Sequence, residues 1–218
     1  MIYVISGADV NQYPALFDQV YRLRHQVFVE EMGWEDLRSP DGKERDQFDD
    51  HHAVHHLCVR DNLVVGYQRM LLTTRPHLLS EIFPQLCVGT SPRGPGIYEL
   101  TRYCVSPAHR EGRRGVGSVG SELIAGLVEW GLQAGVHKAI IEFEPMWVLR
   151  AMQLQFLARP LGLQTKIGDQ NIVATELTFN EHTLETIRAF RGHEEPVVRC
   201  LGAQEAFVAF ETEHALAS

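Results

Sequence analysis

The sequence predicts an α/β fold. Short apolar runs that are typical of strands alternate along the chain with segments in which apolar residues recur at helical spacing. In the middle of the chain a strand-like run leads through a glycine-rich loop into a long apolar helix, which is the most diagnostic unit of such a fold. No linker rich in Pro, Gly or Ser divides the 218 residues, so we predict a single domain over residues 1–218.

The first half of the chain predicts four strands and one long helix. The strands are expected at Ile2–Ser6, Val54–Arg60, Leu63–Thr73 and Ile97–Val105, with a tight turn at Asp61 and Asn62 between the second and the third. The helix is expected at Pro14–Glu31, because proline suits a first helical turn and apolar residues follow at helical spacing. Seven acidic residues and a Pro-Asp-Gly sequence make Trp34–Asp50 a predicted polar loop.

More helix is expected from residue 78 onward. A single helical turn is expected at Leu78–Phe83, and the long helix runs from the glycine loop to about Ala134. Further helices are expected at Met146–Leu157 and from a cap at Asn180 to about Arg191, with strands at Ala139–Phe143 and Ile172–Phe179. The tail, His193–Ser218, has no clear pattern.

Composition and charge exclude several classes of protein. With 20 basic and 28 acidic residues the net charge is −8, which argues against general nucleic-acid binding. No apolar run approaches the roughly 20 residues of a membrane helix, and the first residues lack the basic start of a signal peptide. The four cysteines are widely spaced, as in reduced proteins. We therefore expect a cytoplasmic protein without a membrane or nucleic-acid partner.

The glycine loop is suited to phosphate. Its backbone amides can surround phosphate oxygens at the start of a helix, and arginines can pair with those oxygens. The residues concerned are Gly112, Gly115 and Gly117 with Arg110, Arg113 and Arg114. The loop resembles the pyrophosphate loop of the N-acetyltransferase-like (GNAT-type) fold, which implies a mixed, twisted sheet flanked by helices. Gly112 departs from that pattern, and a flexible surface turn with solvated arginines is the alternative.

Four short motifs combine carboxylates, guanidiniums and aromatic rings within the first 102 residues. They are Arg24-x-x-x-Phe28 followed by Trp34, Glu44-x-Asp46-x-x-Asp49, Gly66-x-x-Arg69 and Glu99-x-x-Arg102. Arginines placed deep in apolar strands need partners, and the acidic loop supplies carboxylates for them. The motifs therefore predict either a substrate site or an ion-pair network that only holds the loop in place.

These motifs, in this order and spacing, resemble those of the acyl-homoserine-lactone synthases, from about Tyr21 to about Arg150. The resemblance implies an acyltransferase that makes an N-acyl-homoserine lactone signal for quorum sensing from S-adenosylmethionine and an acyl thioester, releasing methylthioadenosine. It implies two small-molecule substrates, without a cofactor or a metal. It also implies that Glu99 is the general base and that Asp46 and Arg102 orient the substrate. The S-adenosylmethionine pocket would be shaped by Arg24, Phe28, Trp34, Asp49 and Arg69.

The acyl thioester has its own set of expected residues. The resemblance implies that Arg110, Arg113, Arg114, Gly115 and Gly117 hold coenzyme A, and that Phe143, Met146 and Trp147 line the acyl chain. The donor is either coenzyme A or acyl carrier protein, and the latter is acidic and needs a broad basic surface. The net charge of −8 and the likeness of Thr73–Leu86 to synthases that use aryl or branched acids favour acyl-CoA. Acyl carrier protein stays the alternative partner.

Other functions remain as rivals. One is another N-acyltransferase of the same fold that acts on a different amine, and another is a sensor that binds acyl-CoA without catalysis. His51, His52, His55 and His56 straddle the start of a strand, where neighbours point to opposite faces, so we expect core or solvated histidines rather than a metal site. Cys104 lacks an adjacent base and is not expected to be a nucleophile.

Overall fold

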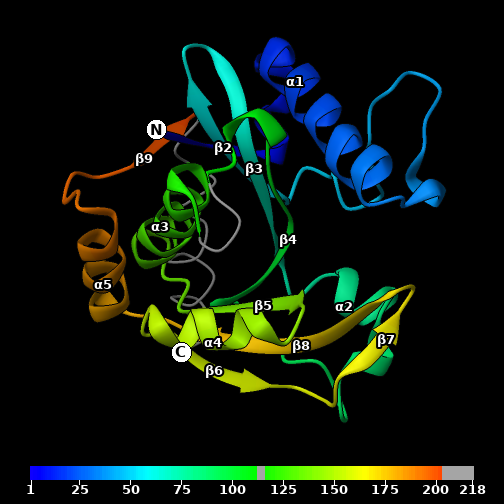
Figure 1. Cartoon of the computed structure of the whole chain (residues 1–218), viewed down its shortest axis with the longest axis vertical. Helices are drawn as coiled ribbons and strands as arrows, with labels where there is room; N and C mark the ends of the chain where they lie inside the picture. Colours follow the sequence, from blue (N-terminus) through cyan, green and yellow to red (C-terminus); the bar gives the residue numbers. More distant parts are fainter. Residues whose placement is uncertain (112–115, 203–218) are drawn as a thin grey trace, which may run out of the picture. The chain divides into compact units, whose positions relative to one another are not determined.

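The computed structural model describes residues 1–111 and 116–202 (Figure 1). They form two compact units. The first contains residues 1–69, 102–111, 116–127 and 196–202, and the second contains residues 70–101 and 128–195. Each unit has both parallel and antiparallel strand pairs together with helices, so the predicted α/β fold with a mixed sheet is confirmed. The single domain over residues 1–218 stays a prediction.

Strands of the first unit pair on both sides of β1 (Ile2–Ser6). It runs antiparallel to β2 (Val54–Arg60) and parallel to β9 (Val198–Leu201). The next strand, β3 (Leu63–Leu72), continues along the chain into the second unit, and β4 (Ile97–Val105) begins in the second unit and continues into the first. Asp61 and Asn62 have φ of +49° and +63°, which is the backbone of a tight hairpin turn, so the predicted turn is confirmed.

The apolar face of α1 (Pro14–Arg24) builds the core of the first unit. Phe17, Val20 and Leu23 are buried there with Ile5 and Leu57 from the strands. Proline at the first helical position needs no hydrogen-bonded N–H, which explains why the helix begins there. The predicted helical segment does continue to Glu31, but His25–Glu31 is a π-helical turn, a rare form that often occurs at functional sites.

The helix α3 (Ser118–Gln133) approaches β3 closely. A Cβ atom on Gly66 would lie 2.7 Å from the Val119 side chain and 3.0 Å from Leu123, so only glycine fits between strand and helix. Gly126 of α3 is similarly close to Ile2 of β1, where a Cβ would lie 2.9 Å from a side-chain carbon. The predicted helix is confirmed, and its glycines bring it against the sheet.

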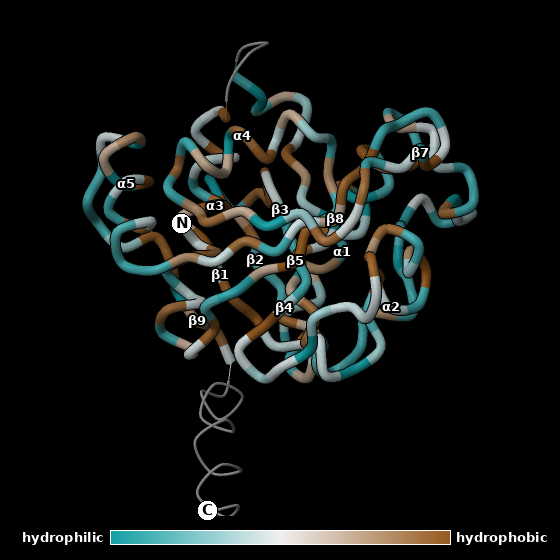
Figure 2. Tube along the Cα trace, turned by 90° about the horizontal axis from the view of Figure 1, so that it is seen from below, coloured by the Kyte–Doolittle hydropathy of each residue, from teal (hydrophilic) through white to brown (hydrophobic). Residues whose placement is uncertain are grey.

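Four strands follow one another in the second unit in the order β6-β8-β5-β4. They are β6 (Leu157–Pro160), β8 (Gln170–Thr178), β5 (Lys138–Phe143) and the first part of β4, while β7 (Thr165–Ile167) pairs with β8. The strand β5 is parallel to β4 and antiparallel to β8. Hydrophobic residues recur along β3, β4, β5 and β8 (Figure 2).

Short helices complete the second unit. They are α2 (Leu78–Glu81), α4 (Met146–Gln153) and α5 (Glu181–Arg191). One face of the sheet carries Ile140 and Ala174, which are buried with Leu79 of α2 and Leu86. On the other face Tyr98 meets the ring of Trp130, with ring centroids 5.3 Å apart. The predicted cap of α5 is confirmed, because the Asn180 side chain accepts a hydrogen bond from the Thr183 N–H at 3.2 Å.

Two expectations need correction. The helix predicted over Met146–Leu157 ends at Gln153, and Leu157–Pro160 forms the strand β6. The left-handed φ of +63° at Gln155 prevents the helix from continuing, and Pro160 is tolerated because β6 pairs on one side only. The tail, in which the sequence has no clear pattern, contains the strand β9. This strand forms because it pairs with β1, which is distant in sequence. Among the described residues, no helix is long and apolar enough to cross a membrane.

Candidate active site

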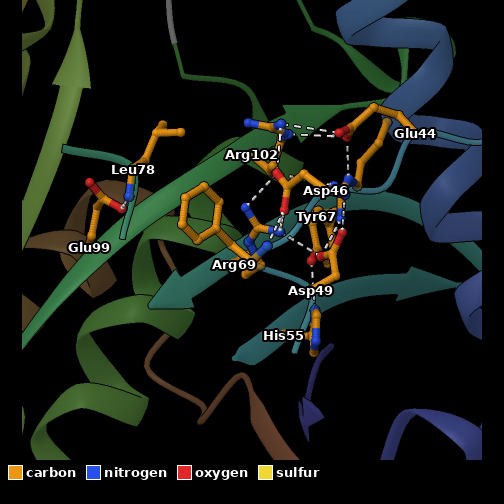
Figure 3. Close-up of polar contacts among 11 residues, drawn as sticks. Glu44, Asp46, Asp49, His55, Tyr67, Arg69, Leu78, Glu99 and Arg102 are labelled. Atoms are coloured by element: carbon orange, nitrogen blue, oxygen red, sulfur yellow. Dashed lines mark hydrogen bonds and ion pairs between the residues drawn. The ribbon is translucent and has the colours of Figure 1, made fainter. Parts of the chain in front are cut away.

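Three arginines and three carboxylates of the first unit form a single network, which we call the acid–arginine network (Figure 3). Arg24 is the last residue of α1, while Arg69 lies on β3 and Arg102 on β4. The carboxylates of Glu44, Asp46 and Asp49 come from the acidic loop. The prediction that this loop supplies the partners of the arginines is therefore confirmed.

Each carboxylate of the network bridges two guanidiniums. Glu44 Oε2 lies 2.5 Å from Arg24 Nε and 3.1 Å from Arg102 Nε.

Asp49 Oδ1 is 2.7 Å from Arg24 and 2.6 Å from Arg69. Asp46 accepts from Arg69 at 2.6 and 2.9 Å and lies 2.7 Å from Arg102. Three positive and three negative charges are thus paired in a closed ring of contacts, which is the arrangement that buried charges require.

Burial and charge act against each other in this network. The side chains of Arg24, Glu44 and Arg69 are fully buried. Burial raises the pKa of the Asp49 carboxyl, but Arg24 and Arg69 outweigh it, and the net pKa is well below its usual value. The pKa values of Glu44 and Asp46 are lowered in the same way, by Arg24 and Arg69 respectively against the effect of burial. All three carboxylates are therefore ionised at neutral pH.

Arg102 has an unusual backbone. Its φ of +55° lies in the left-handed region, although it stands within β4 and is not a glycine. Such a conformation costs on the order of 1–3 kcal/mol and interrupts the alternation of side chains between the two faces of a strand. The guanidinium contacts Glu44 and Asp46, and these ion pairs offset the cost of the strained backbone.

Two aromatic rings lie beside the network. The rings of Phe28 and Trp34 stack with centroids 5.2 Å apart, and Arg102 Cζ is 5.5 Å from the centre of the Phe28 ring. Phe28 is buried within the π-helical turn, whereas Trp34 is 38% exposed. The indole of Trp34 is thus partly accessible to a flat or apolar group.

Glu99 belongs to the second unit and is fully buried. Its Oε2 accepts a hydrogen bond from the Leu78 N–H at 2.7 Å (Figure 3). Its Oε1 accepts one from the Leu79 N–H at 2.6 Å. These are amides of the first turn of α2, which otherwise have no helical partner. Along β4, Glu99 precedes Arg102 by three residues, so the chain keeps their Cα atoms within about 10 Å.

Those of the expected phosphate-binding residues that the structure describes lie beside other protein groups. Arg110 pairs with Glu31 and donates from Nε to the Val105 carbonyl at 3.0 Å. Gly117 comes directly before α3, where the Glu111 carboxylate accepts from the Ser118 N–H at 3.1 Å and thus occupies a position expected for a phosphate. Arg113, Arg114 and Gly115 lie outside the described residues.

The expected acyl-chain residues lie at the end of β5 and the start of α4. Phe143 is the last residue of β5 and is partly buried, as is Trp147 in the first turn of α4. Met146 is 60% exposed. These three apolar side chains are close in sequence and leave apolar surface that a substrate chain can cover.

His55 and His56 are core residues, as predicted. His55 Nδ1 is 2.7 Å from the Tyr67 hydroxyl, and His56 Nδ1 is 3.0 Å from Gln68 Nε2. In the described part of the chain, no group of three or more His, Cys, Asp or Glu is placed to hold a metal ion. Burial raises the pKa of the Cys104 thiol to about 12, so it is not a thiolate at neutral pH.

Two residues were missing from the predicted site. Glu44 was noted in a motif but was not included in the site, although it is a fully buried member of the network. Glu142 on β5 was not considered, although it is hydrogen-bonded to Glu99. The sequence does contain a signal for it, because an acidic residue ends an apolar strand two positions after Ile140 and therefore shares its face.

Comparison with known proteins gives consistent results. A family model described as autoinducer synthase matches residues 9–187. The isovaleryl-homoserine lactone synthase of Bradyrhizobium diazoefficiens is 35% identical over 188 residues, which cover 86% of this chain and 84% of that protein. An acyl-homoserine-lactone synthase of Acinetobacter nosocomialis is 41% identical over 102 residues, 46% of this chain and 55% of that protein.

Solved structures extend the similarity over the whole length. The CoA-dependent acyl-homoserine lactone synthase BjaI, in a structure with SAM and isopentyl-CoA, matches with a TM-score of 0.88 and 33% identity over 98% of this chain and 99% of that chain. A putative N-acetyltransferase from Lactobacillus plantarum matches with a TM-score of 0.54 and 20% identity over 82% of this chain and 98% of that chain, which concerns the fold alone. The N-acetyltransferase-like fold predicted from the glycine loop is confirmed.

Proposed function

The chain belongs to the autoinducer synthase family, and we propose that it makes an N-acyl-homoserine lactone from S-adenosylmethionine and a coenzyme A thioester. The observation that carries this proposal is the acid–arginine network, because it presents both signs of charge at one place. S-adenosylmethionine has a cationic sulfonium, an ammonium and a carboxylate, and so requires both signs. The two substrates suffice for the reaction, without a cofactor.

The exposure of the network supports a division of labour. Asp46, Asp49 and Arg102 keep 11%, 7% and 7% of their side chains exposed, whereas Arg24, Glu44 and Arg69 keep none. Asp49 bridges the two buried arginines. We therefore assign contact with the ammonium of the substrate to Asp46 and contact with its carboxylate to Arg102. The buried members hold these two groups in position. The exposed part of the Trp34 indole is suited to pack against the substrate.

Acylation needs a neutral amine. In the proposed step the ammonium of S-adenosylmethionine gives a proton to Glu99, directly or through a water, and its nitrogen attacks the thioester carbonyl. The carbon–sulfur bond breaks, and the coenzyme A thiolate takes the second proton from nitrogen. The methionine carboxylate then attacks its own γ-carbon, and the bond to the sulfonium breaks, which closes the lactone and releases methylthioadenosine. No covalent intermediate with the protein is required.

Coenzyme A is the donor that the sequence and the relatives favour. The net charge of −8 opposes docking of an acidic carrier protein. The full-length relatives are described as CoA-dependent, with isopentyl-CoA bound, and as an isovaleryl-homoserine lactone synthase. We propose a branched acyl group of this size for the present chain. Arg110, Arg113 and Arg114 stay the candidates for the coenzyme A phosphates.

The test uses the purified chain with S-adenosylmethionine and isovaleryl groups on either carrier. Mass spectrometry should find isovaleryl-homoserine lactone and methylthioadenosine, and kcat/KM should be at least tenfold higher with coenzyme A than with acyl carrier protein. A preference for the carrier protein would overturn the donor and leave the synthase reaction in place. Acyl-CoA binding without either product would instead support the sensor, and an acylated product of a different amine would support another N-acyltransferase.

A further inference from the structure

Glu99 and Glu142 form a pair of carboxyl groups on one face of the second unit's sheet. In the parallel pairing of β4 with β5, Glu99 is the partner of Ile140. Glu142 follows two residues later and therefore points to the same face. The two side chains interact, and a hydrogen bond with Glu99 is among the causes that raise the pKa of Glu142. A hydrogen bond between two carboxyl groups requires a proton on one of them.

The surroundings decide which group carries that proton. Both oxygens of Glu99 accept backbone hydrogen bonds from α2, at 2.7 and 2.6 Å, which favours the ionised form of this residue. Glu142 Oε1 is buried and accepts no hydrogen bond from any donor in the described part of the chain. A protonated Glu142 that donates to Glu99 satisfies both observations.

Other charged groups of this face are already paired. Glu176 on β8 lies opposite Ile140 and is bonded to Lys138 of β5 and Arg159 of β6, at 3.2 and 3.1 Å. His77, which precedes α2, bonds to the Arg75 carbonyl at 2.8 Å and to Ser91. Burial and then the charge of Glu99 raise the pKa of Glu142 well above its usual value, which agrees with a neutral Glu142 at working pH.

We infer that Glu142 is a positioning residue that keeps one proton in a shared pair with Glu99 and thereby sets the pH at which Glu99 becomes a base. This inference rests on the proposed function, in which Glu99 accepts the proton of the substrate ammonium. Before the reaction the pair holds one proton and one negative charge. When the ammonium N–H bond breaks and an O–H bond forms on Glu99, the pair becomes neutral. Release of one proton to solvent restores the singly protonated pair.

The pH profile of kcat/KM separates this role from a structural one. Glu142→Leu removes the hydrogen-bond donor to Glu99, so the ionised form of Glu99 is less favoured. The acid limb of the kcat/KM profile should therefore move to higher pH by about one unit, which is a tenfold loss of kcat/KM at pH values below the limb. Glu142→Gln keeps an N–H donor and should keep the acid limb near that of the wild type. The exposed neighbour Glu144 offers a matched control, Glu144→Gln, which should not move the limb. An acid limb that Glu142→Leu leaves in place would overturn the inference.

A second measurement does not depend on turnover. Infrared spectra at pH 7.5 should contain the carbonyl band of a buried protonated carboxyl group, which Glu142→Gln removes and Glu144→Gln keeps. Identical bands in the wild type and Glu142→Gln would refute the shared proton, whatever the activity. If the band behaves as expected and the wild type makes no lactone, the pair is real and the proposed function is the part that fails.

Discussion

Glu99 has two tasks that a single substitution does not separate. Its carboxylate accepts the amides of Leu78 and Leu79, and in the proposed reaction it also accepts the substrate proton. Glu99→Gln should reduce the acylation rate by on the order of 10²–10⁴, the usual contribution of a general base. The measurement is the rate of thiol release at saturating substrates, at a temperature where circular dichroism shows the variant folded.

Ser80 provides the control for this variant. Its hydroxyl accepts from the His77 N–H at 3.1 Å, so Ser80→Ala loosens the same helical turn without touching Glu99. We expect it to lose a few-fold in rate at most. Equal losses in Glu99→Gln and Ser80→Ala would show that the order of α2, rather than a base, controls the rate.

Asp49 shows what a buried ion pair contributes to stability. It bridges Arg24 and Arg69, which are both fully buried. Asp49→Asn removes the negative charge that the two guanidiniums share. Removing one partner of a buried pair costs about 3–5 kcal/mol. Urea unfolding at pH 7 should show a loss of that size, while the exposed Asp36→Asn should change the free energy of unfolding by about 0.5 kcal/mol or less. A loss below 1 kcal/mol for Asp49→Asn would mean that water reaches the network.

At the scale of elements, the close packing of α3 against β3 depends on Gly66. An added Cβ would lie 2.7 Å from Val119, so Gly66→Ala forces strand and helix apart and should destabilise the protein by about 1–3 kcal/mol. Gly94→Ala is the matched control, because its Cβ would meet nothing closer than 3.4 Å. Thermal unfolding of both variants tests this. Equal melting temperatures would show that α3 can shift without cost.

Strand β4 carries the two functional side chains through a break in its own geometry. The positive φ of Arg102 ends the regular alternation that begins at Glu99. A regular strand would assign these two residues to opposite faces, because their separation of three is odd. The break therefore changes the direction in which the motif presents its second side chain, that of Arg102, which contacts Glu44 and Asp46.

At the scale of the whole molecule, the buried titratable groups predict how stability depends on pH. Burial lowers the pKa of His55 and His56 to about 3, whereas about 6.5 is expected in the unfolded chain. The unfolded chain therefore binds protons between these values that the folded chain does not, and stability falls as pH falls below about 6.5. Burial lowers the pKa of His77 in the same direction. The slope should reach about 1.4 kcal/mol per pH unit for each histidine.

The network carboxylates act at lower pH. Because the folded pKa values of Glu44, Asp46 and Asp49 are below those of the unfolded chain, their contribution is complete above about pH 4 and is lost below it. Urea unfolding between pH 7.5 and 3.5 should show the histidine phase and the onset of the carboxylate phase. His56→Gln should reduce the pH dependence of the free energy of unfolding by the contribution of one proton, and only in the histidine phase. A free energy that stays constant from pH 7 to 5 would contradict the neutral buried histidines.

Local pattern was sufficient for much of this protein. Pro14 marked the start of α1, Asn180 marked the cap of α5, and Asp61 with Asn62 marked the hairpin turn, because each acts on the backbone of its own segment. The four motifs likewise contain all six members of the acid–arginine network, since a buried arginine requires a carboxylate nearby.

Contacts distant in sequence decided the rest. The strand β6 exists because Leu157–Pro160 pairs with β8, although its residues continue a helical pattern, and β9 exists because it pairs with β1. Glu142 meets Glu99 only through the register of β5 on β4, which no local pattern contains. The sequence by itself therefore determined which arginines and carboxylates form the buried network. The tertiary structure decided which carboxyl groups share a proton, because that depends on the distance between Glu99 and Glu142, which are 43 positions apart in the chain.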